Sequence, residues 1–272
     1  CDTARQETDM GKETSVTGCF VRCLFGDHQI LNFPGVLVEA RWCVAQPQPE
    51  PLLWYCYGEV NRDHLRSCGV EPTMLSPEPF CQFGHDDGKG IKQQGIVRGG
   101  SSLWRHKYPA IADALEHYPA AVWLDMDTML SGTLPSDFWA RMGKGQAFQG
   151  TLGQFGMRRV WWREEDIRKL PLGAFLYWRG SETIKRMLDL YAEHPAEWDM
   201  IVLVRLVDEL MDGWKGAEAY KAMGFQVYCH TLYKGRSNLV FDSEVPLFIT
   251  RVRNKPTLRQ TMMQRQEALV HV

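Results

Sequence analysis

The sequence lacks the features that would place it in a membrane or bind it generally to a polyanion. No stretch approaches the ~18 consecutive apolar residues that a membrane-spanning helix needs. The first 17 residues are polar and have no apolar centre of the kind found in a signal peptide. The formal net charge of −2 excludes a strongly basic overall balance. We therefore expect a soluble, cytoplasmic protein with no membrane span.

The eight cysteines lack the regular spacing of a disulfide framework or a zinc site. Cys19 and Cys23 form a CxxxC pair, but the second ligand pair of a structural zinc site is missing. Several cysteines lie inside apolar runs such as CFVRCLF and LLWYCY, which favours buried free thiols in a reducing compartment. The even number leaves disulfides open as the alternative.

Repeats, low-complexity tracts and long linkers are absent as well, and what remains is an ordinary globular composition. Hydrophobic residues make up 44% and charged residues 24%, enough for a substantial core. A chain of 272 residues fits one large domain. We expect a flexible arm over residues 1–17 and a single domain over residues 18–272.

Patterns of strands and helices alternate along the first half of the chain. Apolar runs bounded by glycine or polar residues predict the strands, and a Gly- and Pro-rich stretch predicts a long loop. This alternation predicts an α/β fold with a mixed, mainly parallel sheet flanked by helices. The expected strands are Cys19–Phe25, Leu52–Tyr57, Thr73–Leu75 and Ala120–Leu124, the helices are Asp63–Cys68 and Ser102–Glu116, and the loop is residues 76–101.

Two carboxylates, Asp125 and Asp127, follow the apolar run Ala121–Leu124. Burying an ionised carboxylate is costly unless it is paired or bound to a metal, so both should emerge at the carboxyl end of the strand, where open α/β sheets bind ligands. Strictly alternating side chains would send both acids to one side and Met126 to the other. Two carboxylates so placed can hold a hard divalent cation. The alternative is a surface turn with solvated acids.

The segment YPAAVWLDMDTMLSGTLPSDFW, which contains this pair, resembles the GT-A glycosyltransferases, with their apolar strand followed by DxDT or DxDA. The resemblance implies a Rossmann-like fold in which Asp125 and Asp127 bind Mn²⁺ or Mg²⁺ on the diphosphate of a nucleotide sugar such as UDP-glucose. It also implies that residues 18–130 form the half of the domain that binds the nucleotide sugar and residues 131–272 the half that binds the acceptor.

Two further segments agree with this resemblance before the acidic pair. Phe25, Gly26 and Asp27 end the first strand and look like the loop that meets the uracil and ribose in such enzymes. Arg105 and Lys107 occupy the place where these enzymes often direct a basic residue at the diphosphate. An exposed helix face explains these two cations equally well.

The segment VYCHTLYKGRSN, residues 227–238, partly resembles the glycogenin-like retaining branch of the superfamily. That branch carries HxxGxxK, whereas His230, Lys234 and Gly235 stand here in an HxxxKG spacing. The resemblance implies that His230 completes the metal shell and that Lys234 and Gly235 reach the diphosphate. An imidazole suits Mn²⁺ and a lysine can neutralise a phosphate, while a structural histidine is the alternative.

Two segments between the acidic pair and His230 also resemble parts of the superfamily. Residues 170–191 look like the segment that lines the donor sugar and acceptor, in which Gly173 would allow close approach of a ligand or simply make a turn. Asp208 and Glu209 look like the acidic pair near the sugar, one of which is the general base in inverting members. An amphipathic helix with solvated acids explains Asp208 and Glu209 nearly as well.

The prediction is a metal-dependent hexosyltransferase whose acceptor is a saccharide, a protein, a small molecule or a hydroxymethylated DNA base. Aromatic residues such as Trp178 can stack on sugars, although core packing explains most of them. The segments MRRVWWREEDIRK and RVRNKPTLRQ mix basic and aromatic or apolar residues and suit an anionic acceptor, but acidic residues interrupt the first.

Two alternatives stay open. A haloacid dehalogenase-type phosphohydrolase carries DxDxT, but Met129 stands in place of its last residue and the motif lies in the middle of the chain. A non-catalytic module that binds a sugar or nucleotide is the second.

Overall fold

The structure is a computed structural model of the 272-residue chain. It describes residues 18–25, 35–46, 50–76, 91–93, 96–98, 105–126, 128–130, 134, 136, 138–141, 148–152, 171–194, 202–203, 205–206, 209, 229–230, 248–249 and 256–270.

A six-stranded sheet organises these residues in the order β3-β2-β1-β6-β9-β8. The strands β3, β2, β1 and β6 pair in parallel, whereas β9 pairs antiparallel with both β6 and β8. Only β9 therefore opposes the common direction, and the predicted α/β fold with a mixed, mainly parallel sheet is confirmed. The strands are β1 (Cys19–Leu24), β2 (Leu52–Cys56), β3 (Thr73–Met74), β6 (Ala120–Leu124), β8 (Phe148–Leu152) and β9 (Pro171–Arg179).

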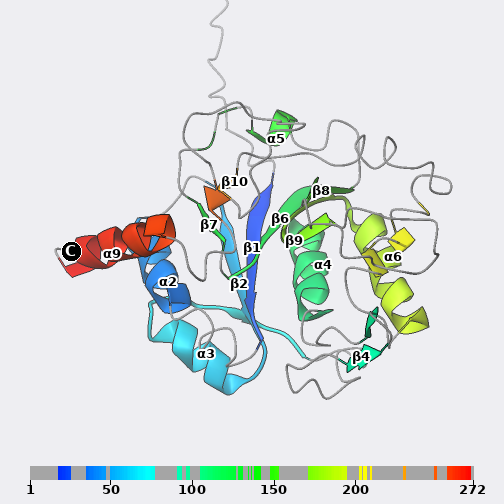
Figure 1. Ribbon diagram of the computed structural model, residues 1–272, viewed down its shortest axis with the longest axis horizontal. Helices are drawn as coiled ribbons and strands as arrows, with labels where there is room; N and C mark the ends of the chain where they lie inside the picture. Colours follow the sequence, from blue (N-terminus) through cyan, green and yellow to red (C-terminus); the bar gives the residue numbers. More distant parts are fainter. Residues whose placement is uncertain are drawn as a thin grey trace, which may run out of the picture.

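Helices cover both faces of this sheet (Figure 1). The helices α2 (Gly35–Ala45), α3 (Glu59–Arg66) and α9 (Pro256–Val270) lie to one side of β1, and α4 (Lys107–His117) and α6 (Ser181–Glu193) lie to the other. Alternating side chains of β1 contribute to the core on both faces of the sheet. Val21 and Cys23 pack under α4 and α6, while Leu24 packs under α2 and α3. Burial on both faces explains why β1 and β6 are apolar along most of their length.

A second, smaller sheet has the order β10-β11-β7. It consists of β7 (Met129–Leu130), β10 (Cys229–His230) and β11 (Phe248–Ile249). In Figure 1, β7 and β10 lie near β1 on its α2 side. The short helix α5 (Phe138–Arg141) follows β7 in the chain and packs its Phe138 ring 5.9 Å from the ring of Phe20, near the start of β1.

The predicted strands and helices of the first half are present, but α3 begins at Glu59 rather than Asp63 and α4 begins at Lys107, with residues 102–104 outside the described residues. Two further places differ. The strands β4 (Ile91–Gln93) and β5 (Ile96–Arg98) form an antiparallel pair inside residues 76–101, for which the sequence predicted a loop throughout. That prediction is wrong for these strands, which are too short to show a clear alternation among the surrounding glycines. The helix α2 was not expected at all.

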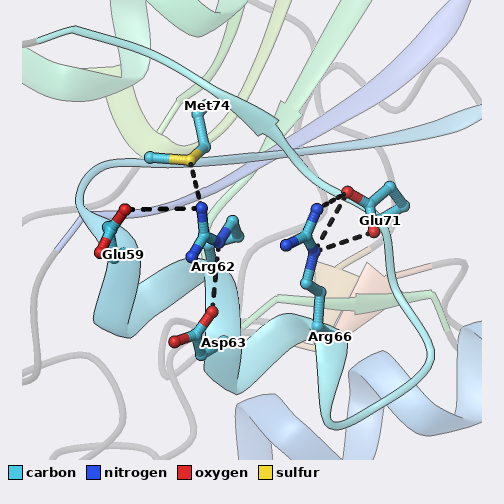
Figure 2. Close-up of polar contacts among 6 residues, drawn as sticks. All are labelled: Glu59, Arg62, Asp63, Arg66, Glu71 and Met74. Carbon is cyan, nitrogen blue, oxygen red and sulfur yellow. Dashed lines mark hydrogen bonds and ion pairs between the residues drawn. The ribbon is translucent and has the colours of Figure 1, made fainter.

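Charged side chains on the outer face of α3 connect this helix to the chain around β3 (Figure 2). Arg66 Nε donates to both oxygens of Glu71, at 3.1 and 3.0 Å. Arg62 lies 3.7 Å from Glu59 and 3.1 Å from Asp63, and it also contacts the sulfur of Met74. Exposed pairs of this kind contribute about 0–1 kcal/mol each, so they orient the α3–β3 connection more than they stabilise it.

The cysteines with described side chains are free thiols, as expected: Cys19, Cys23, Cys43, Cys56 and Cys68. Within the described ranges, no helix has both the length and the apolar character needed to cross a bilayer.

Candidate functional site

Three residues that directly follow parallel strands meet at the carboxyl edge of the large sheet. Phe25 follows β1, Tyr57 follows β2 and Asp125 follows β6, and these strands are neighbours. The backbone N–H of Tyr57 donates to the carbonyl of Leu24 at 3.0 Å, so that β1 and β2 end next to each other. Asp125 is half-buried. Ligands bind at this edge in open α/β sheets.

The chain turns directly after β6. The N–H of Thr128 donates to the carbonyl of Asp125 at 2.8 Å and closes a turn over residues 125–128, which we call the acidic turn. The strand itself ends at Leu124, and the side taken by Asp127 stays a prediction. Met126 still points inward, with 4% of its surface exposed, and joins the core under α2 and α3. Asp127 itself lies outside the described residues.

The carboxylate of Asp125 has a fixed hydrogen-bond donor. The indole N–H of Trp123 donates to Asp125 Oδ1 at 2.6 Å, and Trp123 itself is 1% exposed. A carboxylate that ligates a metal is usually oriented by such a second hydrogen bond. The geometry at Asp125 therefore fits a metal ligand.

The far end of the acidic turn is attached to the large sheet. Arg22 of β1 donates from Nη2 to the carbonyl oxygen of Thr128 at 2.7 Å and to Glu39 Oε1 of α2 at 3.2 Å. Thr128 is fully buried, and Arg22 and Glu39 are each 1% exposed. The turn is thus held at both ends and by Met126 between them.

The small sheet contains both His230 and Met129, the residue that follows the acidic turn. Ile249 of β11 pairs with Met129 on one side and with His230 on the other. Since neighbouring strands lie ~4.8 Å apart, the backbones of His230 and Met129 are separated by about 10 Å. Met129 is two residues beyond Asp127 in the chain. The backbone of a residue distant in sequence therefore lies two strands away from the residue that directly follows the acidic turn.

Aromatic side chains pack together at the same edge. The ring of His106, directly before α4, stacks on Phe25 at 5.6 Å and meets Tyr57 edge-on at 4.3 Å. The Tyr57 hydroxyl donates to the carbonyl of His106 at 3.1 Å. These contacts place the start of α4 beside the ends of β1 and β2. Gly26 and Asp27, the other residues expected at the base and ribose, lie outside the described ranges.

Arg105 and Lys107 do not lie on an exposed helix face, so that alternative is wrong. Arg105 is 2% exposed and Lys107 5% exposed. The Arg105 guanidinium lies 5.0 Å from the centre of the Tyr191 ring of α6, and Lys107 Nζ lies 5.3 Å from that of Tyr108. Whether either cation reaches a diphosphate stays a prediction, and it would require movement away from these rings.

Glu209 has a defined partner on α6. Arg186 donates to both of its carboxylate oxygens at 2.7 Å and also contacts Glu193. The hydrogen bonds from Arg186 hold the pKa of the Glu209 carboxyl below its usual value. A depressed pKa makes a carboxylate a weaker general base. Asp208 is not among the described residues, so the assignment of the pair as catalytic stays a prediction.

The remaining candidates divide between the core and the undescribed segments. Trp178 is fully buried in the core, where its ring lies edge-on to Tyr108 at 6.0 Å, so it does not stack on a sugar. Gly173 lies within β9. Lys234 and Gly235 fall outside the described ranges, as do the basic residues of MRRVWWREEDIRK.

Among the residues that the structure describes, no three His, Cys, Asp or Glu side chains gather into a metal-binding group. This absence does not concern two of the three predicted ligands, because only the backbone of His230 is described and Asp127 is not described at all. The fit of a cation therefore rests on Asp125, on its bond from Trp123 and on the backbone position of His230.

The arrangement defines a class of fold: an acidic turn at the carboxyl end of a central parallel strand, with a small second sheet beside it and one antiparallel strand next to that central strand. Galactosyltransferase LgtC, solved with donor and acceptor sugar analogs, is similar to this chain with a TM-score of 0.54 and 10% identity. The match covers 91% of this chain and 94% of that one.

A structure of an active-site mutant of LgtC gives a TM-score of 0.52, 10% identity, and coverage of 92% and 95% respectively. These structural neighbours are GT-A glycosyltransferases, and the likeness confirms the predicted GT-A-like fold. No protein-family model matches the chain. No curated protein matches it either.

Four residues of the site were not singled out from the sequence: Arg22, Tyr57, His106 and Trp123. Tyr57 carried a usable signal, since it follows β2 as Phe25 follows β1. Trp123 did as well, because in a strand the residue two positions before an acid shares its face. Arg22 was visible as one charged residue within an apolar run, but its partners were not.

Proposed function

We propose that the chain is a metal-dependent glycosyltransferase that moves a sugar from a nucleotide-diphosphate sugar to an acceptor hydroxyl. The observation that carries this proposal is that β10, which contains His230, belongs to the same small sheet as β7, which follows the acidic turn. The GT-A-like fold supports this proposal. The acidic turn follows β6, which lies on the opposite side of β1 from β2, and open α/β sheets bind ligands where the strand order reverses in this way.

Asp125, Asp127 and His230 are the proposed cation ligands. Two carboxylates and one imidazole suit Mn²⁺, and the carboxylates also suit Mg²⁺. A bound cation would stabilise negative charge on the departing nucleotide diphosphate. Lys234 and Gly235, four and five positions after His230 in the chain, are proposed to contact the same diphosphate.

The edge formed by β1 and β2 is proposed to receive the nucleoside of a donor such as UDP-glucose. Phe25 follows β1 at this edge, and its packing on His106 gives the edge an aromatic wall. Gly26 and Asp27, the next residues in the chain, are proposed to contact the base and ribose. Arg105 and Lys107, the chain neighbours of His106, are proposed to move away from the rings on which they pack and to add positive charge near the diphosphate.

Of the two proposed bases, Asp208 is the stronger candidate. Arg186 engages both oxygens of Glu209, whereas a general base must accept the proton of the acceptor hydroxyl. The acceptor itself is proposed to be any of the predicted classes: a saccharide, a protein, a small molecule or a hydroxymethylated DNA base. Acceptor binding that falls steeply with added salt would select DNA.

Thermal unfolding with nucleotides tests the proposal. UDP, UDP-glucose, GDP and GDP-mannose are each added with and without Mn²⁺ to the wild type, to Asp127→Ala and to a control, Asp63→Ala, which changes an exposed acid on α3. A ligand at about 100 times its Kd stabilises the folded state by roughly 2.7 kcal/mol. We expect a shift that needs Mn²⁺, is lost in Asp127→Ala and is kept in Asp63→Ala.

Absence of any shift with the four nucleotides would remove the transferase proposal. Hydrolysis of p-nitrophenyl phosphate that depends on Mg²⁺ and Asp125 would then establish the phosphohydrolase. A nucleotide shift without any sugar transfer would indicate the binding module.

A further inference from the structure

A charged side chain lies in the centre of the large sheet, where apolar residues are the rule. Arg22 belongs to β1, which has two parallel strands on one side and three strands on the other. Its neighbours Val21 and Cys23 face α4 and α6, so the guanidinium extends toward the opposite face, which α2 covers. Burying an arginine is unfavourable unless its hydrogen bonds are satisfied. Its partners therefore indicate why it is there.

Those partners come from three separate parts of the chain. Arg22 bonds to the carbonyl of Thr128 at 2.7 Å and to Glu39 at 3.2 Å, and its guanidinium carbon lies 5.4 Å from the centre of the Trp54 ring. The ring and the carboxylate fix the plane of the guanidinium. With the plane fixed, the bond to Thr128 has a defined direction.

The C-terminal helix contributes the next member of this group. Arg265 of α9 forms an ion pair with the second oxygen of Glu39 and lies 5.2 Å from the centre of the Trp42 ring of α2. Arg265 is 7% exposed. Burial and the neighbouring Arg22 lower the pKa of Arg265 to about 10, which leaves it protonated at neutral pH. Glu39 is thus shared by two guanidinium groups, one from the sheet and one from α9.

We propose that Arg22 is a positioning residue for the acidic turn, and that α9 takes part by holding Glu39 in place through Arg265. Arg22 binds the carbonyl of Thr128, whose own N–H closes the turn onto Asp125. Both peptide groups of Thr128 are therefore fixed, and the two carboxylates precede this fixed point. The proposal rests on the proposed function only in taking the acidic turn as the cation site.

Hydrogen exchange of the backbone amides tests the positioning directly. The rates are measured by mass spectrometry on peptides that cover residues 120–130 and 256–270, in the wild type, Arg22→Met, Arg22→Lys, Glu39→Gln and Arg265→Met. The control is Met187→Ala, which changes a fully buried side chain on the opposite face of the sheet. All variants are compared at a temperature at which each is folded.

Arg22→Met removes a charge-assisted hydrogen bond, and we expect exchange at Thr128 to rise about tenfold or more. Arg22→Lys keeps a single point charge and should give a smaller rise, and Glu39→Gln should act in the same direction as Arg22→Met. Arg265→Met should raise exchange both in α9 and at Thr128. Unchanged exchange at Thr128 in Arg22→Met, or an equal rise in Met187→Ala, would overturn the positioning role. A rise confined to α9 in Arg265→Met would overturn the part assigned to α9.

Titration with Mn²⁺ in the presence of UDP separates this proposal from the proposed function. We expect the Kd for Mn²⁺ to rise about tenfold in Arg22→Met and to stay unchanged in Met187→Ala. If the wild type binds no Mn²⁺ but exchange at Thr128 rises in Arg22→Met, the proposed function is refuted and the positioning role is supported. Normal Mn²⁺ binding by Arg22→Met with unchanged exchange would refute the positioning role and support the function.

Discussion

The indole N–H of Trp123 donates to Oδ1 of Asp125 across 2.6 Å, joining a buried side chain of β6 to the first residue after the strand. The indole is 1% exposed and packs in the core under α4 and α6. The orientation of the first proposed ligand is therefore set by a side chain that the core holds rigid.

Trp123→Phe keeps most of the buried ring and removes only this donor. We expect the affinity for Mn²⁺ in the presence of UDP to fall by roughly 10- to 100-fold, the usual cost of losing a hydrogen bond to a ligand. Calorimetric titration measures this, with Trp178→Phe as the matched control, since Trp178 is also fully buried but belongs to β9. Equal affinities in the wild type and Trp123→Phe would show that the bond has no part in ligand orientation.

Met126 anchors the middle of the acidic turn in the core. Met126→Ala removes a buried side chain and should lower the free energy of unfolding by about 2–5 kcal/mol, whereas Met126→Leu, with a similar volume, should cost less than about 1.5 kcal/mol. Urea unfolding gives both values. Similar losses in the two variants would mean that the site does not discriminate by volume and is loosely packed.

The pairing of Glu209 with Arg186 separates a structural role from a catalytic one. Because this pair is largely exposed, Glu209→Gln should change stability by no more than roughly 1 kcal/mol. The depressed pKa of Glu209 means that the stabilisation is present above the usual carboxyl pKa and is lost as the pH falls through the lowered value.

Steady-state kinetics provides the second readout for this acidic pair. If Asp208 is the base, Asp208→Asn should lower kcat by about 10²- to 10⁴-fold, while Glu209→Gln changes it far less. The reverse order would assign the proton transfer to Glu209 in spite of its bonds to Arg186.

Cys19 makes stability depend on alkaline pH. Burial raises the pKa of its thiol from 9.0 to about 12. Between these values the folded state keeps a proton that the unfolded state loses, so stability should fall as the pH rises from 9 toward 12, by up to about 1.4 kcal/mol per pH unit. Cys19→Ala should reduce this slope and leave the dependence below pH 9 unchanged. Identical slopes above pH 9 would contradict the assignment.

The central strands and the acidic pair were predictable because their signals are local. Ala120–Leu124 is an apolar run followed by acids, and the end of the strand before Asp125 follows from the cost of burying charge. The fold class followed from the same alternation of elements. The turn at residues 125–128 was not predicted, since it is closed by a backbone hydrogen bond that no side-chain pattern reports.

The helix α2 and the attachment of the acidic turn depend on contacts between distant residues. Glu39 interrupts the apolar pattern of GVLVEARWCVA, and its burial is explained by Arg22, 17 positions earlier, and by Arg265 of α9. Arg22 in turn bonds to a carbonyl 106 positions later. The placement of His230 likewise requires β11 between β10 and β7, which the sequence alone does not reveal.

The order of β10, β11 and β7 also determines when the small sheet can form during synthesis of the chain. Met129 meets its strand partner only when Ile249 has left the ribosome, and at ~5–20 residues per second that interval lasts on the order of 6–24 s. During this time β1, β2 and β6 have all been made and can pair, because their contacts are closer in sequence. Arg22 and Glu39 can join early, whereas Arg265 emerges after Ile249. A nascent chain can therefore pair the central strands of its large sheet well before it can form the small sheet that follows the acidic turn.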